Sequence, residues 1–176
     1  LWWCPDPRFV LFPDDLKVSK SIQALMKKNL PAYAKASAGK FEFTINKSFK
    51  EVIHNCKQTK REGQAGTWIT DEVEKAYFKM HQLGYAHSAE TWKDGKLVGG
   101  LYGIKLGKVF FGESMFSNES NARKFAFINY VKLLKEEGIE LIDCQVYTEH
   151  LESLGARMIK REIFLELLRK NIEQGT

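Results

Sequence analysis

The stretch TDEVEKAYFKMHQLGYAHSAETWKDGKLVGGLYGIKLGKVFFGESM, residues 70–115, predicts the fold of this chain. Thr70 can cap the first turn of a helix, and Gly84 supplies the left-handed exit that ends it. The residues that follow alternate between apolar and polar as strands do, and Asp94-Gly95 is a strong signal for a two-residue hairpin. We therefore predict a helix followed by a three-stranded meander. The apolar stripe of the helix comprises Val73, Ala76, Tyr77, Met80 and Leu83, and the strands span 87–93, 96–104 and 108–115.

Downstream of the meander, the apolar periodicity switches repeatedly between that of a helix and that of a strand. The predicted elements are a helix at 120–137, a strand at 140–147, a short helix at 149–154, a strand at 157–159 and a helix from residue 161. The order helix, meander, helix, strand, helix, strand resembles that of the N-acetyltransferase superfamily. We expect an α/β (α+β) fold whose larger part is an N-acetyltransferase-like (GNAT-type) mixed-sheet domain.

The junction before the middle helix, residues 116–123, reads FSNESNAR. Superfamily members that bind acetyl-CoA have a glycine-rich turn here, because bare backbone N–H groups hold the pyrophosphate. This junction has no glycine, and Glu119 lies in its middle. The sequence therefore argues against an acyl-CoA cofactor. An acyl-CoA-dependent N-acyltransferase is kept only as an alternative function.

Upstream of the meander, the chain is strongly basic. Between Lys17 and Arg61 it has ten lysines and one arginine against only Glu42 and Glu51, although the net charge of the whole chain is only +5. Such segregation is typical of a surface that binds a polyanion, and a lysine-rich solvated face is the alternative. Because the composition changes after residues 61–66, we predict a small N-terminal β/α domain at 1–64 and a second domain at 65–176.

The elements of this basic domain are short. Residues 1–16 contain three of the four prolines and are expected to be extended and turn-rich. Ser19 can cap a helix that ends by Pro31. The remaining elements are a flexible loop at 35–39, a strand at 41–45 and a helix at 49–56.

Several classes of protein are disfavoured by composition. No apolar run reaches the length of a membrane helix, so we expect a cytoplasmic protein with no membrane partner. The three cysteines lack CxxC spacing and the four histidines lack HExxH spacing, which favours reduced, mostly buried thiols and no metal site. The chain opens at Leu1 without a methionine, and we expect that residues upstream of it are missing.

Four blocks occur in a specific order along the chain. They are LWWCPDPR at 1–8, GTWIT at 66–70, the run from GGLYG at 99–103 to GESMFS at 112–117, and LIDCQV at 141–146. In these blocks the chain resembles the leucyl/phenylalanyl-tRNA–protein transferases. The resemblance implies transfer of leucine, phenylalanine or, less readily, methionine from an aminoacyl-tRNA to proteins that begin with arginine or lysine, which marks them for degradation. It implies no metal, cofactor or enzyme-bound acyl intermediate.

The resemblance also implies roles for three polar residues. Gln145 would accept a hydrogen bond from the attacking amine, and Asp143 would polarise Gln145; alternate residues of a strand share a face, so the two side chains should point together. An orienting role for Gln145 is equally open, since an amide is a poor base, and a plain strand-end pair is the alternative. Glu113 would recognise the acceptor's N-terminal arginine or lysine, whereas the alternative is a salt bridge to a nearby lysine.

Other residues match positions that bind the tRNA in the family. Leu101 and Met115 would line the pocket for the transferred side chain, where apolar, flexible groups suit leucine and phenylalanine alike; Trp68 would stack on the terminal adenosine or border this pocket. As bare sequence, all three are ordinary core residues. Contacts to the tRNA backbone would come from Lys17, Lys20, Lys27 and Lys28.

Three further hypotheses concern a thiol nucleophile, a non-catalytic function and the oligomeric state. Cys144 with His150 could suggest a thiol nucleophile, but Cys144 should lie on the strand face opposite Asp143 and Gln145, which favours a buried thiol. A non-catalytic tRNA- or RNA-binding module would explain the lysines and leaves Asp143, Gln145 and Glu113 without a purpose. We expect the protein to be a monomer.

Overall fold

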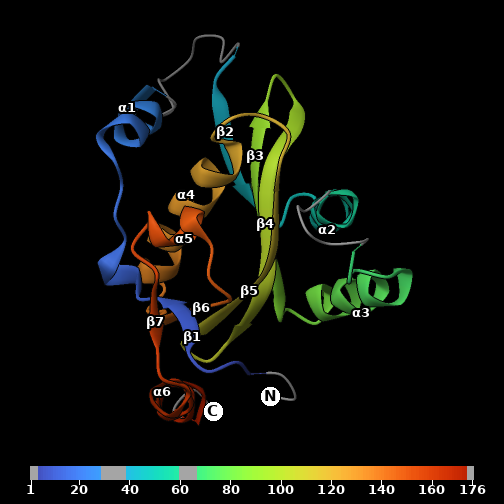
Figure 1. Ribbon diagram of the computed structural model, residues 1–176. Coiled ribbons are helices and arrows are strands. Elements are labelled where there is room, and N and C mark those ends of the chain that lie inside the picture. The colour runs from blue at the N-terminus through green and yellow to red at the C-terminus, as the bar shows by residue number, and fades with distance from the viewer. Residues whose placement is uncertain (1–3, 29–38, 60–66, 174–176) are drawn as a thin grey trace. The chain divides into compact units, whose positions relative to one another are not determined.

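The computed structural model of this chain describes residues 4–28, 39–59 and 67–173. Seven strands hydrogen-bond in the order β2-β3-β4-β5-β6-β1-β7 and form one mixed sheet (Figure 1). The mixed α/β class is therefore confirmed, as is the predicted order of elements from residue 70 onward. The strands are β1 (Arg8–Leu11), β2 (Phe41–Ile45), β3 (Ala86–Lys93), β4 (Lys96–Leu106), β5 (Val109–Ser117), β6 (Leu141–Gln145) and β7 (Arg157–Ile159). The helices are the 3-10 turn η1 (Pro13–Asp15), α1 (Lys20–Lys28), α2 (Phe49–Gln58), α3 (Asp71–Gln82), α4 (Ala122–Glu136), α5 (Glu149–Glu152) and α6 (Arg161–Glu173).

Close contacts group the chain into two compact units. Unit 1 comprises Leu1–Val18, Ile104–Glu113 and Tyr130–Thr176, and unit 2 comprises Ser19–Gly103 and Ser114–Asn129. The domain boundary that we predicted after residue 64 falls at residues outside the described ranges and stays a prediction. The predicted loop at 35–39 also lies outside them except for Gly39.

Unit 2 is organised around the predicted meander. The hairpin between β3 and β4 turns at Asp94 and Gly95, whose φ angles of 50° and 74° are those of the left-handed turn that this dipeptide predicts. Helices α2 and α3 lie on one face of β2, β3 and β4, and α4 lies on the other (Figure 1). One core cluster joins Phe49, Val52 and Ile53 of α2 to residues of β3 and β4. Burial on both faces explains why β4 has no charged residue between Lys96 and Lys105.

Helix α3 begins and ends as predicted, but fewer residues of its apolar stripe pack against the core. The Thr70 side chain accepts a hydrogen bond from the backbone N–H of Val73 at 3.3 Å, and Gly84 has a φ of 83°. Val73, Tyr77 and Met80 pack against the core cluster. The prediction was wrong for Ala76, which is exposed, and for Leu83, which is 63% exposed. Leu83 is the C-terminal cap of α3 and follows the last helical residue, Gln82.

Helix α4 lies unusually close to β4. A Cβ atom added to Gly99 of β4 would be 2.7 Å from the Cβ of Ala122. Any larger residue at Gly99 would therefore push the first turn of α4 off the sheet. This close approach gives a structural reason for glycine in the 99–103 block.

Unit 1 is built from strands distant in sequence. β6 pairs with β5 in parallel and with β1 antiparallel, and β1 also pairs with β7. Residues 1–16 were predicted to be extended. Within them, β1 is an interior strand of the sheet, and its four residues are all buried. β6 ends at Gln145, two residues before the predicted end, because Gln145 adopts a left-handed backbone conformation with φ of 66°.

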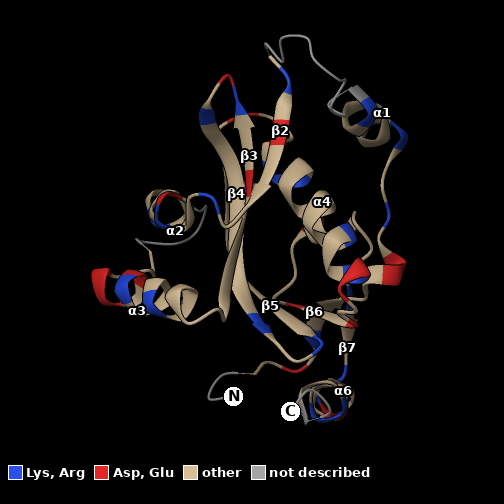
Figure 2. Cartoon of the chain, turned by 180° about the vertical axis from the view of Figure 1, so that it is seen from behind, with Lys and Arg blue, Asp and Glu red and all other residues tan. Residues whose placement is uncertain are grey.

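Charged residues are unevenly distributed over the helices of unit 2 (Figure 2). Helix α1 carries lysines at both ends and no acid, whereas the first turn of α3 contains Asp71, Glu72 and Glu74. Acids there favour α3, because they face the positive end of its dipole. Among the described residues, no helix has both the length and the apolar character needed to cross a membrane.

Candidate active site

Asp143 is a fully buried acid in the middle of unit 1. Its strand, β6, is hydrogen-bonded on both sides, with Phe111 of β5 and Val10 of β1 as its register partners. The exposed fraction of Asp143 is 0%. A carboxylate so placed needs strong donors, because it has lost its hydration.

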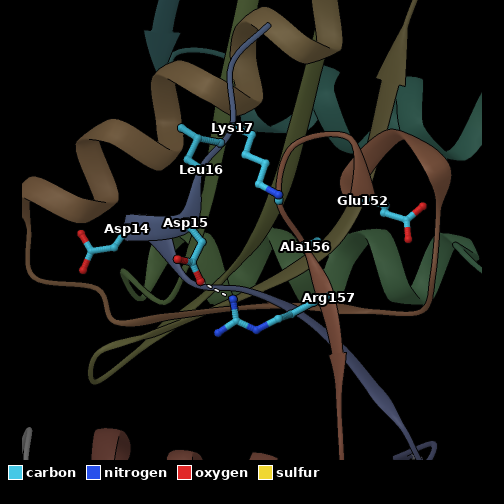
Figure 3. A pocket seen from close by; sticks show the side chains of 8 residues that line it. Asp14, Asp15, Leu16, Lys17, Glu152, Ala156 and Arg157 are labelled. Atoms are coloured by element: carbon cyan, nitrogen blue, oxygen red, sulfur yellow. Dashed lines mark hydrogen bonds and ion pairs between the residues drawn. The ribbon is translucent and has the colours of Figure 1, made fainter.

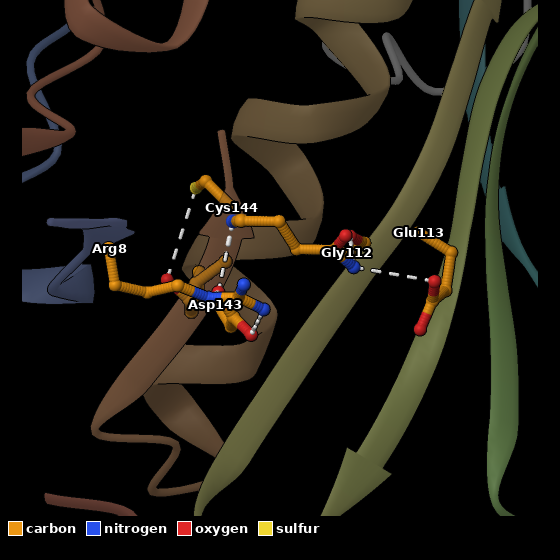
Figure 4. Close-up of polar contacts among 7 residues, drawn as sticks. Arg8, Gly112, Glu113, Asp143 and Cys144 are labelled. Carbon is orange, nitrogen blue, oxygen red and sulfur yellow. Dashed lines mark hydrogen bonds and ion pairs between the residues drawn. The ribbon is translucent and has the colours of Figure 1, made fainter. Parts of the chain in front are cut away.

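Arg8 of β1 provides two of those donors (Figure 4). Its Nε donates to Oδ1 of Asp143 at 2.9 Å, and one terminal nitrogen donates to Oδ2 at 2.8 Å. Arg8 is itself only 3% exposed, and its guanidinium lies 5.2 Å from the centre of the Phe164 ring. The two residues form a buried, two-pronged ion pair that fixes the plane of the carboxylate.

Gln145 is bound to Asp143 through its backbone. The backbone N–H of Gln145 donates to Oδ1 of Asp143 at 2.9 Å. Its side-chain amide nitrogen donates to the backbone oxygen of Gly112 at 3.1 Å and to the carboxylate of Glu113 at 3.3 Å (Figure 4). Because both partners are acceptors, they establish which end of the amide is nitrogen. The side-chain carbonyl oxygen of Gln145 is therefore the amide atom that makes neither of these two contacts.

The three polar residues singled out from the sequence thus belong to one hydrogen-bonded group in unit 1. We expected the side chains of Asp143 and Gln145 to point together as alternate residues of a strand. The carboxylate of Asp143 instead accepts from the backbone N–H of Gln145, whose φ is left-handed. Glu113 is partly buried and accepts from Gln145. What this group can do is present an oriented amide beside a carboxylate.

The three residues predicted to receive the aminoacyl end all belong to unit 2 and differ in exposure. Trp68 is 45% exposed, and its ring meets that of Tyr77 edge to face. Leu101 is 2% exposed and Met115 is partly buried. Their pocket role stays a prediction.

The predicted tRNA-binding lysines lie in α1 and in the connection that precedes it. Lys17 follows η1 and lines a pocket with Asp15, Glu152 and Arg157, where Arg157 pairs with Asp15 (Figure 3). Lys20 and Lys27 are exposed on α1, and their separation of seven residues places them on the same side of that helix. The side chain of Lys28 lies outside the described residues.

Cys144 lies in the same strand as Asp143 and Gln145 and has a different environment. Burial of its thiol, with a further contribution from the charge of Asp143, raises the pKa of Cys144 well above its ordinary value. A thiol held in its protonated form is a poor nucleophile at neutral pH. The expectation of mostly buried thiols holds fully only for Cys56, since Cys4 and Cys144 are partly exposed as residues. Among the described residues, no three His, Cys, Asp or Glu side chains are grouped as a metal ion requires.

Comparison with known proteins identifies the family. The family model described as leucyl/phenylalanyl-tRNA protein transferase matches residues 10–169. The chain belongs to the leucyl/phenylalanyl-tRNA protein transferase family. A leucyl/phenylalanyl-tRNA–protein transferase of Flavobacterium johnsoniae is 55% identical over 169 residues, covering 96% of this chain and 75% of that protein. One from Syntrophus aciditrophicus is 51% identical over 176 residues, covering 100% of this chain and 70% of that protein.

Similar solved structures support the fold alone. The structure of L-PGS from Bacillus licheniformis has a TM-score of 0.51 at 11% identity, covering 97% of this chain and 65% of that one. A functionally unknown conserved protein from Staphylococcus epidermidis has a TM-score of 0.52 at 9% identity, covering 88% of this chain and 57% of that one. The activity of this leucyl/phenylalanyl-tRNA protein transferase family member, an aminoacyl-transferring enzyme, therefore rests on its family and not on these structures.

Arg8 belongs to this group of polar residues, but the sequence did not predict its contact with Asp143. It lies in the first matching block, but nothing in that block gave it a role. The available signal was a charged residue beside the apolar run Phe9–Leu11, since a buried arginine needs a carboxylate. Its partner, 135 positions away, could not be identified without the pairing of β1 with β6.

Proposed function

We propose that this protein transfers leucine, phenylalanine or, less readily, methionine from an aminoacyl-tRNA to the α-amine of proteins that begin with arginine or lysine, and so marks them for degradation. The observation that carries the proposal is the oriented amide of Gln145 beside Glu113. It is supported by the membership of the chain in the leucyl/phenylalanyl-tRNA protein transferase family.

The chemistry requires little beyond orientation. The acceptor amine forms a bond to the carbonyl carbon of the aminoacyl ester, the carbon–oxygen bond to the terminal ribose breaks, and the ribose hydroxyl leaves with a proton. An ester is already activated, and an α-amine has a pKa of roughly 8, so positioning supplies much of the rate.

Gln145 is suited to orient the attacking amine. Its amide nitrogen is engaged by Gly112 and Glu113, so its carbonyl oxygen is the atom that accepts a hydrogen bond from the amine. That bond directs the nitrogen lone pair at the ester and stabilises the positive charge that develops on the amine. In this proposal Gln145 orients and stabilises, and the amine proton passes to the leaving ribose oxygen.

Glu113 is proposed to select the acceptor. A carboxylate next to the amide places negative charge where the side chain of an N-terminal arginine or lysine lies when the α-amine is bound. A neutral first residue gains nothing from this charge. The acceptor rule of the reaction then follows from one acidic side chain.

The remaining roles concern the tRNA. Trp68, Leu101 and Met115 are proposed to bind the aminoacyl end, and Lys17, Lys20, Lys27 and Lys28 the phosphate backbone. Lysines that contact phosphates release counterions, so binding should weaken steeply as salt rises. We further propose that the enzyme works as a cytoplasmic monomer.

The test is transfer of radiolabelled leucine from leucyl-tRNA to a peptide that begins with arginine, beside the same peptide with glycine first. Transfer to the arginine peptide alone is expected, with Glu113→Gln lowering it for the arginine peptide. Equal labelling of both peptides would exclude the role of Glu113. Salt-sensitive tRNA binding without any transfer would instead favour a non-catalytic RNA-binding module.

A further inference from the structure

We propose that Arg8 is a positioning residue of the transfer reaction, which acts on Gln145 through Asp143. The inference rests on the proposed function, because it names the group that holds the orienting amide in place. Arg8 touches no substrate in this scheme. Its effect passes along one chain of contacts from β1 to β6 to β5.

The first link is the ion pair. Arg8 reaches both oxygens of Asp143, at 2.9 and 2.8 Å, and the two side chains are 3% and 0% exposed. A guanidinium that binds both oxygens fixes the distance and the rotation of the carboxylate together. A lysine carries the same charge at a single point and would leave the carboxylate free to rotate.

The second link is the oxygen that the two partners share. Oδ1 of Asp143 accepts from Nε of Arg8 and also from the backbone N–H of Gln145, each at 2.9 Å. Rotation of the carboxylate would therefore move the acceptor of the Gln145 backbone. The position of Gln145 depends in this way on the orientation that Arg8 imposes.

The third link is the backbone of Gln145 itself. Its φ of 66° is in the left-handed region, which non-glycine residues avoid unless their surroundings hold them there. The hydrogen bond to Asp143 is one such restraint, and it acts on the residue whose side chain must reach Gly112 and Glu113. Loss of the restraint lets the backbone relax and carries the amide away from these two partners.

Strand β1 holds the backbone of Arg8 in a fixed position. It is hydrogen-bonded on one side to β6 and on the other to β7, so Arg8 cannot shift without breaking a ladder. The pairing of β1 with β6 also changes register between Phe9 and Val10, directly opposite Gln145 and Asp143. Irregularities of this kind re-aim side chains next to functional sites.

The experiment compares Arg8→Lys with a matched control, Arg157→Lys, which alters an ion pair to Asp15 at the exposed surface of the same unit. With leucyl-tRNA and an arginine-first peptide, Arg8→Lys should lower kcat by roughly tenfold or more while both KM values stay within about twofold. Arg157→Lys should leave kcat unchanged. Asp143→Asn, which keeps the side-chain volume but not the ion pair, should lower kcat in the same way as Arg8→Lys.

A double-mutant comparison separates positioning from general loosening of the fold. In a Gln145→Ala background, Arg8→Lys should have little further effect on kcat, because the group that it positions is already gone. An equal loss of kcat in both backgrounds, or a lower melting temperature with kcat intact, would reduce Arg8 to a structural role and overturn the proposal.

Hydrogen exchange followed by NMR tests the same links without any substrate. The backbone amide of Gln145 should exchange at least about tenfold faster in Arg8→Lys than in the unaltered protein or in Arg157→Lys. Unchanged exchange overturns the positioning proposal even if transfer occurs. Absence of transfer by the unaltered protein counts against the proposed function, and the exchange result then decides on Arg8 separately.

Discussion

Two buried acids, one in each unit, show how differently the same chemical group can be used. Glu90 of β3 in unit 2 and Asp143 of β6 in unit 1 are both 0% exposed and lie in sheet strands. Asp143 is held by a charged partner, Arg8. Glu90 accepts from neutral groups, namely the hydroxyls of Thr44 at 2.5 Å and Ser88 at 2.6 Å and the backbone N–H groups of Lys47 and Ser48 at 3.4 and 3.3 Å.

The difference lies in what each acid holds in place. The donors to Glu90 come from β2, from its own strand and from the turn that leads into α2, so Glu90 fastens that turn to the sheet. Asp143 fastens a single residue, Gln145, whose side chain reaches Glu113. One acid therefore stabilises a connection in the fold, and the other holds the residue whose amide is proposed to orient the acceptor amine.

The largest effect is expected for Asp143→Ala. It leaves the guanidinium of Arg8 buried without its carboxylate, and such losses lower the free energy of unfolding by about 3–5 kcal/mol. Loss of the oriented amide should also lower transfer by roughly 10²-fold. Urea denaturation and the leucine transfer assay measure the two effects, and a variant with normal transfer would end the distinction between the two acids.

Gln145→Asn should come next and affect transfer only. Asparagine tolerates the left-handed conformation, so the free energy of unfolding should change by less than about 1 kcal/mol. Its side chain is one methylene shorter and cannot keep the contacts with Gly112 and Glu113, so we expect kcat to fall by roughly 10²-fold. A drop in stability as large as that of Asp143→Ala would show that Gln145 has a structural part as well.

Glu90→Gln should lower the stability of the fold and leave transfer nearly unchanged. Replacing one oxygen by an amide nitrogen sets donor against donor at a buried site, which costs about 1–3 kcal/mol of unfolding free energy. At temperatures where the variant is folded, transfer should stay within about twofold of normal. Transfer that falls as far as in Asp143→Ala, in a variant shown to be folded by circular dichroism, would contradict the comparison.

The smallest effect is expected for Cys144, the neighbour of Asp143. Since burial raises the pKa of this thiol, the group stays protonated at neutral pH and should react slowly with iodoacetamide in the folded protein and quickly after unfolding. Cys144→Ala should retain transfer. Fast alkylation that abolishes transfer, with Cys144→Ala inactive as well, would revive the thiol nucleophile that we disfavour.

The meander and its flanking helices were predictable because their signals are local. Thr70, Gly84 and Asp94-Gly95 set dihedral angles and caps within a few residues, and the structure has them as predicted. The prediction was wrong where tertiary position mattered, as for Leu83, whose apolar character does not reveal that it lies past the end of α3. An apolar residue in helical register is only a candidate for burial.

For the candidate site, the sequence determined which residue types are present, and the family resemblance singled out Asp143, Gln145 and Glu113. It could not show that Arg8 pairs with Asp143, or that Gln145 leaves the strand in a left-handed turn. Only the pairing of β1 with β6 decided these points. The physical reason is that caps and turns depend on the energies of neighbouring residues, whereas a buried ion pair depends on which distant strands meet.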